Sequence, residues 1–127
     1  MSIERNRLGI QGEQIAAEAL VARGWRVIGR NVRLRNGELD LIALDGRTLV
    51  FIEVKTRSRS AVAADPLLGR PVLAVGTRKQ VKLRRLAAEW LQRHPAAEDW
   101  DEVRFDAMGV LVCPGGRAEL EHLEAAF

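Results

Sequence analysis

The residues around Asp45-Gly46 constrain the fold of this chain more than any other part of the sequence. Two apolar runs of strand length flank this dipeptide, which readily adopts the positive φ of a type I′ turn. We therefore expect an antiparallel hairpin with Asp45 and Gly46 as its turn residues. In that register Asp40 lies diagonally across from Glu53, with roughly 7–8 Å between their backbones, and both side chains project from the same face as Lys55.

The apolar residues of the hairpin divide between its two faces. The face with the charges also carries Ile42, Leu49 and Phe51. The opposite face is expected to be a core surface made of Leu39, Leu41, Val50, Ile52 and Val54. A three-residue loop in place of the two-residue turn would shift the pairing by one position and rotate Asp40 away from Glu53. The register of the hairpin therefore decides whether the two acids meet.

Periodicity and turn residues place the other elements. They predict helices over residues 5–23 and 77–93 and strands over residues 25–32, 103–111 and 119–127. Gly24 ends the first helix, Thr77 opens the second as the N-cap of a capping box with Gln80, and Pro95 halts it. A helix between the third and fourth strands implies a parallel crossover. The predicted fold is α/β, a three-layer arrangement in the order αβββαββ, with a mixed sheet of four to five strands flanked by helices.

Basic residues concentrate in the middle of the chain. Residues 54–93 hold 10 basic and 2 acidic groups, whereas residues 94–127 hold 2 and 8, within an overall net charge of +3. Part of this segment, residues 57–75, is predicted to be a basic, mobile loop. In the second helix, Arg78, Lys82 and Arg85 recur on one face. This uneven charge distribution indicates either an anionic partner, of which nucleic acid is the simplest choice, or a solvated helix surface.

Length and composition exclude several classes of protein. At 127 residues and 47% hydrophobic content, a single domain over residues 1–127 can bury roughly two thirds of its unfolded surface. No apolar run approaches the roughly 20 residues of a membrane span, and the polar first residues do not resemble a signal peptide. The single cysteine, Cys113, cannot form an internal disulfide. We therefore expect a cytoplasmic protein without a membrane partner.

The informative charge pattern is Asp40, then twelve residues, then Glu53, one residue and Lys55. Mg²⁺ prefers hard oxygen ligands and often takes one or two carboxylates, so Asp40 and Glu53, with the carbonyl of Val54, form a candidate metal site. Lys55 on the same face is suited to orient an attacking water or to stabilise negative charge. The alternative is a surface charge cluster, since cross-strand ion pairs contribute about 0.2–1 kcal/mol.

Glu13 is the odd residue of the first predicted helix. At about 100° per residue it lies on the same arc as Gly9, Ala16, Ala17 and Leu20, and not with the polar residues of that helix. An acid on this arc would face the sheet and join the carboxylate site. The alternative is an exposed glutamate, because acids are seldom buried without a partner.

Three motifs carry a resemblance to a known family. Residues 37–42, residues 51–57 and residues 9–13 resemble the bacterial YraN-like family of uncharacterised, predicted endonucleases. That family is similar to archaeal Holliday-junction resolvases and belongs to the PD-(D/E)xK restriction-endonuclease-like superfamily. The similarity extends over nearly the whole chain. The proline that names the superfamily motif is absent here, because Leu39 precedes Asp40.

The resemblance implies a role for each charged residue of the predicted site. It makes Asp40 and Glu53 metal ligands, Lys55 the catalytic lysine and Glu13 an auxiliary acid. The function predicted in this way is a DNA endonuclease that hydrolyses phosphodiester bonds with Mg²⁺ or Mn²⁺, with branched DNA as one expected substrate. A homodimer is one expected assembly, because cutting symmetry-related strands of a junction needs paired sites.

Basic residues complete the prediction. Those expected to hold DNA phosphates are Arg57, Arg59, Arg78, Lys79, Lys82 and Arg85. Aromatic residues make up 5% of the chain, which favours contacts to phosphate and shape over base stacking. Two alternatives stay open: a DNA-binding module of the same fold that acts in repair or recombination without cutting, and a protein that binds an acidic protein surface.

Overall fold

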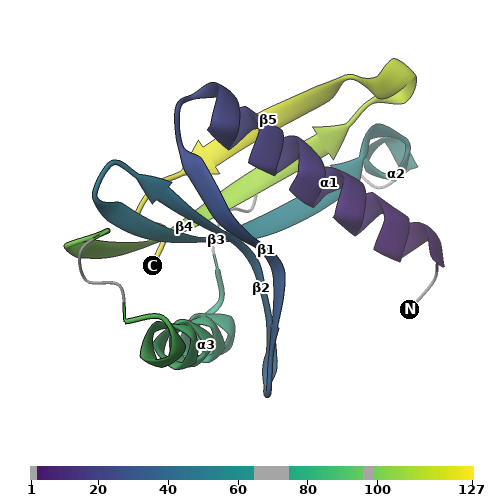
Figure 1. Ribbon diagram of the computed structural model, residues 1–127. Coiled ribbons are helices and arrows are strands. Elements are labelled where there is room, and N and C mark those ends of the chain that lie inside the picture. The colour runs from purple at the N-terminus through teal and green to yellow at the C-terminus, as the bar shows by residue number, and fades with distance from the viewer. Residues whose placement is uncertain (1–2, 65–74, 96–98) are drawn as a thin grey trace.

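A twisted five-stranded sheet separates the two long helices in the computed structural model, which describes residues 3–64, 75–95 and 99–127 (Figure 1). The helices are α1 (Ile3–Ala22), α2 (Arg59–Ala64) and α3 (Thr77–Arg93). The strands lie side by side in sequence order: β1 (Arg26–Leu34), β2 (Gly37–Asp45), β3 (Thr48–Ser58), β4 (Glu102–Val112) and β5 (Ala118–Leu123). The predicted α/β fold and its order αβββαββ are confirmed. None of the described helices is both long enough and apolar enough to cross a membrane.

The strand directions follow from the connections. Short turns join β1 to β2 and β2 to β3, and these pairs are antiparallel. The chain between β3 and β4 contains α3, and these strands run parallel from Thr48↔Glu102 to Ser58↔Val112. β5 then pairs antiparallel to β4. The predicted parallel crossover is therefore present at the centre of the sheet.

Each face of the sheet buries its own apolar cluster. Under α3, helix residues such as Leu83 and Trp90 pack on Ile42, Leu49, Phe51 and Phe105. Under α1, helix residues such as Ala17 and Leu20 pack on Leu41, Val50, Ile52 and Met108. The central strands are covered on both faces, which is why β3 and β4 are almost continuously apolar in their buried halves.

The β2–β3 turn lies one residue later than predicted. Asp45 pairs with Thr48, so Gly46 and Arg47 form the turn. Arg47 is held at this place by Asp101, because its Nε donates to the carboxylate at 3.0 Å and its carbonyl accepts the Asp101 N–H at 3.0 Å. Each strand partner thereby shifts by two positions. Because side chains alternate with a period of two, the predicted faces survive the shift.

Leu39 is an exception to the predicted division of faces. Pairing between β2 and β3 ends at Leu41↔Ile52, and beyond it β1 and β2 continue as a two-stranded ribbon that extends past α3 (Figure 1). Two-stranded ribbons twist strongly. The twist moves Leu39 into the cluster under α3, where it is 2% exposed. Its predicted place on the opposite face is wrong.

The start of α3 also differs from the prediction. Gly76 is the N-cap, no side chain caps the helix, and Thr77 is its first residue. The side chain of Gln80 donates instead to the carbonyl of Val75 at 2.6 Å, while its backbone N–H donates to Gly76 at 2.9 Å. The predicted helix is present, but the predicted capping box is not.

The segment expected to be a loop over residues 57–75 is partly regular. Arg57 and Ser58 end β3, and α2 follows directly. The reason is local: Ser58 Oγ accepts the N–H of Ala61 at 3.2 Å, as the side chain of an N-cap residue does. The rest of the expected loop, residues 65–74, lies outside the described residues, and the predicted mobility stays a prediction.

Candidate active site

Acids from three elements gather where β2 leaves β3. The last paired residues are Leu41 and Ile52, so Asp40 and Glu53 are the next residues of the two strands, and the same register would place them opposite each other. The Asp40 carboxylate accepts the backbone N–H of Val54 at 2.9 Å. Beyond Leu41 the β2 backbone no longer pairs with β3, so the Asp40 side chain takes the place of a backbone acceptor for this N–H. The bond orients Asp40 toward β3.

The pKa of Asp40 reports its crowded surroundings. Burial raises the pKa of Asp40 to about 8, from an ordinary value near 3.8, and the neighbouring charge of Glu53 adds to the shift. The Val54 N–H opposes the shift, and Glu13 contributes further repulsion. Burial and the charge of Glu53 both favour the protonated form of the Asp40 carboxyl. Two carboxyl groups that share a site commonly behave in this way.

Glu13 reaches the same place from α1. Burial raises the pKa of Glu13, a hydrogen bond with Asn31 opposes this change, and Glu38 and Glu53 add repulsion. Its Oε2 atom is buried and has no hydrogen-bond partner among the described residues. A buried carboxylate oxygen without a partner calls for an explanation, and a bound cation is one. The prediction that Glu13 faces the sheet agrees with this position.

Gly12 allows α1 to lie close enough to β3 for this arrangement. A Cβ atom at Gly12 would lie 1.9 Å from Thr56 Oγ1 and 2.7 Å from Thr56 Cβ. Rotation of the threonine can move the hydroxyl but not its Cβ. The helix therefore packs directly on Thr56, three residues beyond Glu53, and Gly12 acts as a positioning residue for the adjacent Glu13.

We expect Gly12→Ala to destabilise the protein, whereas Gly9→Ala stabilises it. A Cβ at Gly9 would have no atom within 4 Å, so that substitution gains helix propensity of about 1 kcal/mol. At Gly12 the same gain is offset by overpacking that costs about 1–3 kcal/mol. Urea unfolding of the two variants provides a matched comparison. Equal stability of the two would contradict the close packing of α1 on β3.

Two lysines lie beside the acids. Burial lowers the pKa of Lys55, Glu53 opposes that shift, and the cations Arg57 and Lys79 reinforce it. Lys79 Nζ lies 3.2 Å from Glu53 Oε1, and the Glu53 side chain is only 11% exposed. Lys79, which was predicted to contact phosphates, thus pairs with Glu53 across the space between α3 and β3. Its place one turn before the core residue Leu83 is the sequence signal for this contact.

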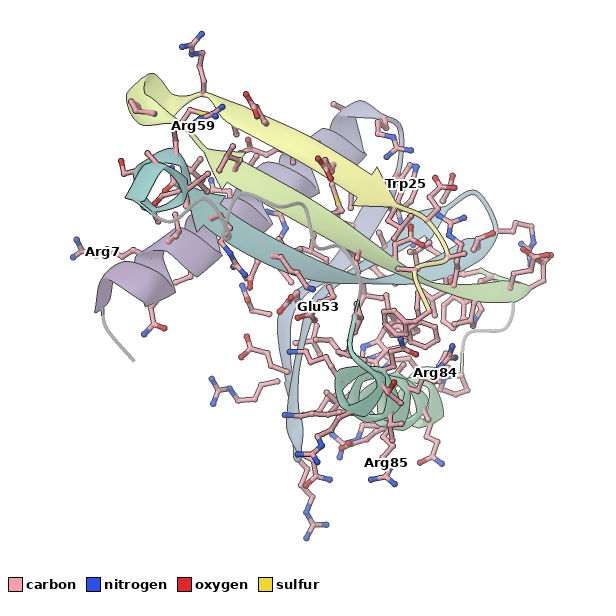
Figure 2. The ribbon with its side chains drawn as sticks, turned by 180° about the vertical axis from the view of Figure 1, so that it is seen from behind. Arg7, Trp25, Glu53, Arg59, Arg84 and Arg85 are labelled. Atoms are coloured by element: carbon pink, nitrogen blue, oxygen red, sulfur yellow. The ribbon has the colours of Figure 1, made fainter. Side chains whose placement is uncertain are left out.

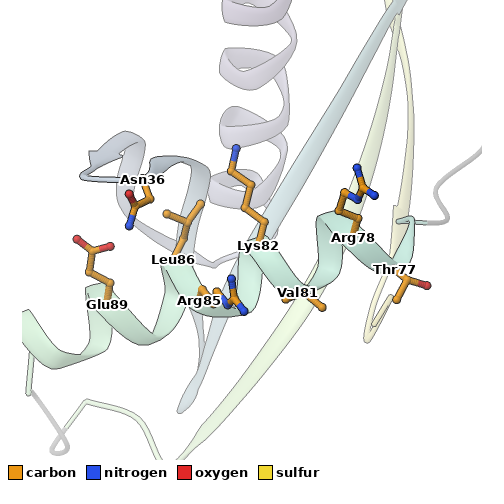
Figure 3. Close-up of a pocket in the computed structure, with 8 residues that line it drawn as sticks. All are labelled: Asn36, Thr77, Arg78, Val81, Lys82, Arg85, Leu86 and Glu89. Atoms are coloured by element: carbon orange, nitrogen blue, oxygen red, sulfur yellow. The ribbon is translucent and has the colours of Figure 1, made fainter.

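The other predicted phosphate contacts lie in three places. Arg78, Lys82 and Arg85 line a groove of about 720 Å³ beside α3 (Figure 3). Arg57 and Glu13 line another groove of about 580 Å³, between α1 and the end of β3. Arg59 forms an ion pair at 2.7 Å with Glu119 of β5, and Figure 2 shows it beside α2 and distant from Glu53. The structure therefore does not bring Arg59 to the acids.

Glu13, Asp40 and Glu53 have the ligand chemistry that could hold a hard divalent cation. Glu13, Asp40 and Glu53 supply carboxylate oxygens, the ligands that Mg²⁺ prefers, and Glu13 contributes the buried oxygen that lacks a partner. Their mutual repulsion is of the kind that a bound cation relieves. Within residues 3–64, 75–95 and 99–127, no three His, Cys, Asp or Glu side chains are already arranged to hold a metal ion. In this metal-free arrangement, Lys79 neutralises Glu53.

Among the described residues, Asp106 is the one fully buried acid, and its partners are structural. It is 0% exposed on β4 and accepts two hydrogen bonds from Arg104, at 2.8 and 3.0 Å. His122 of β5 and the N–H of Ala125 lie within 2.8 and 3.0 Å of its oxygens. Arg23 lies 2.6 Å from Nδ1 of His122, and because arginine only donates, Nδ1 accepts and Nε2–H donates to Asp106. This network fastens β5 and the residues after it to the sheet.

Comparison with known proteins places the site within a recognised family. The model of the "Uncharacterised protein family UPF0102" matches residues 12–110, a range that includes all three acids and both lysines. A UPF0102 protein of Nocardia farcinica is 41% identical over 124 residues, covering 98% of this chain and 91% of its own. One from Beutenbergia cavernae is 47% identical over 119 residues, covering 94% of each chain. One from Frankia alni is 45% identical over 125 residues, covering 97% and 96%.

Proposed function

This chain belongs to UPF0102, the YraN-like family that its motifs predict, and from that premise we propose that it is an endonuclease that hydrolyses phosphodiester bonds of DNA with a divalent cation. The family description assigns no activity, so the proposal depends on the site. The observation that carries it is the meeting of Glu13, Asp40 and Glu53 at the point where β2 leaves β3.

A surface charge cluster does not account for this arrangement. Glu53 is 11% exposed, and burial is the largest cause of the raised pKa of Asp40. Surface ion pairs contribute little, and acids that repel one another in a buried place reduce stability. Strongly perturbed acids of this kind concentrate at functional sites. The arrangement lowers the stability of the fold, and its use would be to hold a cation.

The residues have separable roles in the proposed reaction. Asp40 and Glu53 would hold Mg²⁺ or Mn²⁺, with the carbonyl of Val54 as the predicted third ligand and Glu13 as the auxiliary acid. Such a cation would supply a more acidic bound water and would offset the charge of the scissile phosphate. The Val54 N–H keeps the Asp40 carboxylate oriented. Lys55 presents a compact ammonium group that donates to the attacking water or to a phosphate oxygen.

Cleavage of defined DNA substrates tests the proposal. The purified full chain is incubated with linear duplex, flap and four-way-junction DNA, with Mg²⁺, with Mn²⁺ or with EDTA. We expect cleavage that requires the metal and that falls on the order of 10²–10³-fold in Glu53→Gln, since a metal centre supplies several kcal/mol of transition-state stabilisation. Glu121→Gln, an exposed acid on β5, is the matched control and should cut normally.

Two outcomes would overturn the proposed activity. One is that none of the substrates is cut with either metal. The other is that Glu53→Gln cuts as fast as the unaltered chain. Salt-sensitive DNA binding without any cleavage would instead support the alternative of a DNA-binding module with the same fold.

A further inference from the structure

A groove separates the outer surface of α3 from the turn between β1 and β2. It encloses about 720 Å³, and Figure 3 shows α3 along one side with Asn36 of the turn facing it. Its lining is Asn36, Thr77, Arg78, Val81, Lys82, Arg85, Leu86 and Glu89. None of these eight residues belongs to the carboxylate site. The groove is therefore a second concave surface, formed by two elements that are distant in sequence.

In the described part of the chain, the cations of this groove lack the acidic partners that Lys79 and Arg93 of the same helix have. Within the described residues, Arg78, Lys82 and Arg85 have no ion pair to a carboxylate, whereas Lys79 pairs with Glu53 and Arg93 with Glu89. Glu89 is the one acid among the lining residues, and Arg93 contacts it at 3.3 Å. The groove thus keeps a net positive charge, and its ligand should be an anion.

The groove is formed in advance of any ligand. A Cβ atom at Gly37, the residue after Asn36, would lie 3.1 Å from Leu86 Cδ1 and 3.1 Å from Lys82 Cε. The start of β2 therefore packs directly against α3, and glycine permits this close approach. The contact holds the turn that carries Asn36 close to the helix that carries the cations.

The row of cations is long enough to meet several phosphates of one DNA strand. Arg78, Lys82 and Arg85 stand at positions i, i+4 and i+7 of α3, which spans about 10 Å at 1.5 Å per residue. One strand of duplex DNA carries a phosphate about every 3.4 Å along the axis, which is shorter than the distance between successive cations of this row. No aromatic residue is among those that line the groove, so it offers no stacking surface for unpaired bases.

We propose that this groove binds the phosphate backbone of duplex DNA and holds the substrate of the proposed nuclease independently of the carboxylate site. The inference rests on the proposed function for the identity of the anion. Lys82 and Arg85 contact successive phosphates, Arg78 extends the row, and the Asn36 amide donates to a phosphate oxygen from the opposite side. The exposed Arg35 of the same turn adds positive charge at the rim.

Binding measured without metal tests this proposal. Fluorescence anisotropy with a blunt duplex in EDTA, between about 50 and 200 mM salt, compares the full chain with the double variant Lys82→Gln/Arg85→Gln. We expect affinity to fall at least about tenfold and the slope of log K against log salt to decrease by about 2, since each lost phosphate contact removes about 0.9. The unaltered chain should bind the duplex more tightly than a single strand of the same length.

Controls separate this proposal from the proposed activity. Arg26→Gln/Arg117→Gln removes the same charge from the start of β1 and the segment before β5, and it should keep both the affinity and the salt slope. If Lys82→Gln/Arg85→Gln binds like the unaltered chain, the groove is not the DNA site, even if the protein cuts DNA. If a single strand binds more tightly than duplex, the assignment to duplex is wrong. If Lys82→Gln/Arg85→Gln loses duplex binding and neither this variant nor the unaltered chain cuts DNA, the groove is supported as the DNA site and the proposed nuclease activity is wrong.

Discussion

Asp40→Asn should make the free energy of unfolding of the metal-free protein less sensitive to rising pH. The pKa of Asp40 is about 8 in the folded protein and near 3.8 as an ordinary value, so between these limits the folded state holds a proton that the unfolded state loses. Unfolding is then favoured as pH increases. The release of one such proton on unfolding changes the free energy of unfolding by at most about 1.4 kcal/mol per pH unit. From pH 5 to 7 we expect the free energy of unfolding of the unaltered chain to fall by about 2–3 kcal/mol more than that of the variant.

The same variant should lose its response to metal. Asparagine retains an oxygen that accepts the Val54 N–H, but it lacks the charge that attracts a cation. At about one hundred times the dissociation constant, Mg²⁺ should stabilise the unaltered chain by about 2.7 kcal/mol and the variant by much less. Urea unfolding at pH 5, 6 and 7, with EDTA or with Mg²⁺, measures both effects, and Glu121→Gln serves as the control.

The prediction on pH and the prediction on metal can be contradicted separately. Equal pH dependence of Asp40→Asn and the unaltered chain would show that the Asp40 carboxyl is ionised in the folded protein. Equal stabilisation of both by Mg²⁺ would show that the cation binds elsewhere. The second result would also remove the basis of the proposed activity, because no other residue in the described part of the chain combines the position and the perturbed acidity of Asp40.

The hairpin acids could be predicted because strand periodicity is local information. The predicted turn was displaced by one residue, yet Asp40 and Glu53 stayed on neighbouring strands, because the partner shift of two preserves faces. The tertiary contact between Arg47 and Asp101 selects the actual turn, and no local pattern contains it. The place of Leu39 depends on where β3 stops pairing with β2, which is likewise a property of the assembled sheet.

The pairing of Lys79 and the burial of Asp106 were harder to predict. Lys79 has the composition and spacing of a phosphate contact, and only the packing of α3 over β3 reveals its pairing with Glu53. In β4, Asp106 alternates with apolar residues as an exposed residue would, but this strand is covered on both faces. Asp106 is therefore 0% exposed, while the apolar Val103 near the strand end is 43% exposed. Alternation identifies a strand correctly but assigns its faces only where one of them meets solvent.

Asp106→Ala should cause the largest loss of stability of any single substitution considered. It removes the acceptor of hydrogen bonds from Arg104, His122 and the Ala125 N–H. The Arg104 and His122 side chains, which are 22% and 12% exposed, keep only their contacts to residues other than Asp106. Breaking a buried charge pair from one side costs about 3–5 kcal/mol. Against a total stability of about 5–15 kcal/mol, this loss approaches unfolding for a domain of ordinary stability. Urea unfolding at pH 7 measures it, and Glu102→Gln, an exposed acid on the same strand, is the control.

The pH dependence of this loss distinguishes the network from a simple packing defect. Burial raises the pKa of Asp106, but hydrogen bonds from His122, Arg104 and the Ala125 N–H together hold it below the ordinary value near 3.8. An acid with a depressed pKa contributes stability above its unfolded value, and that contribution disappears as pH falls through the folded value. The difference between the unaltered chain and Asp106→Ala should therefore be largest near neutral pH and shrink below about pH 4. A difference that stays constant from pH 7 to strongly acid conditions would mean that the lost side chain acts through its volume and not through its charge.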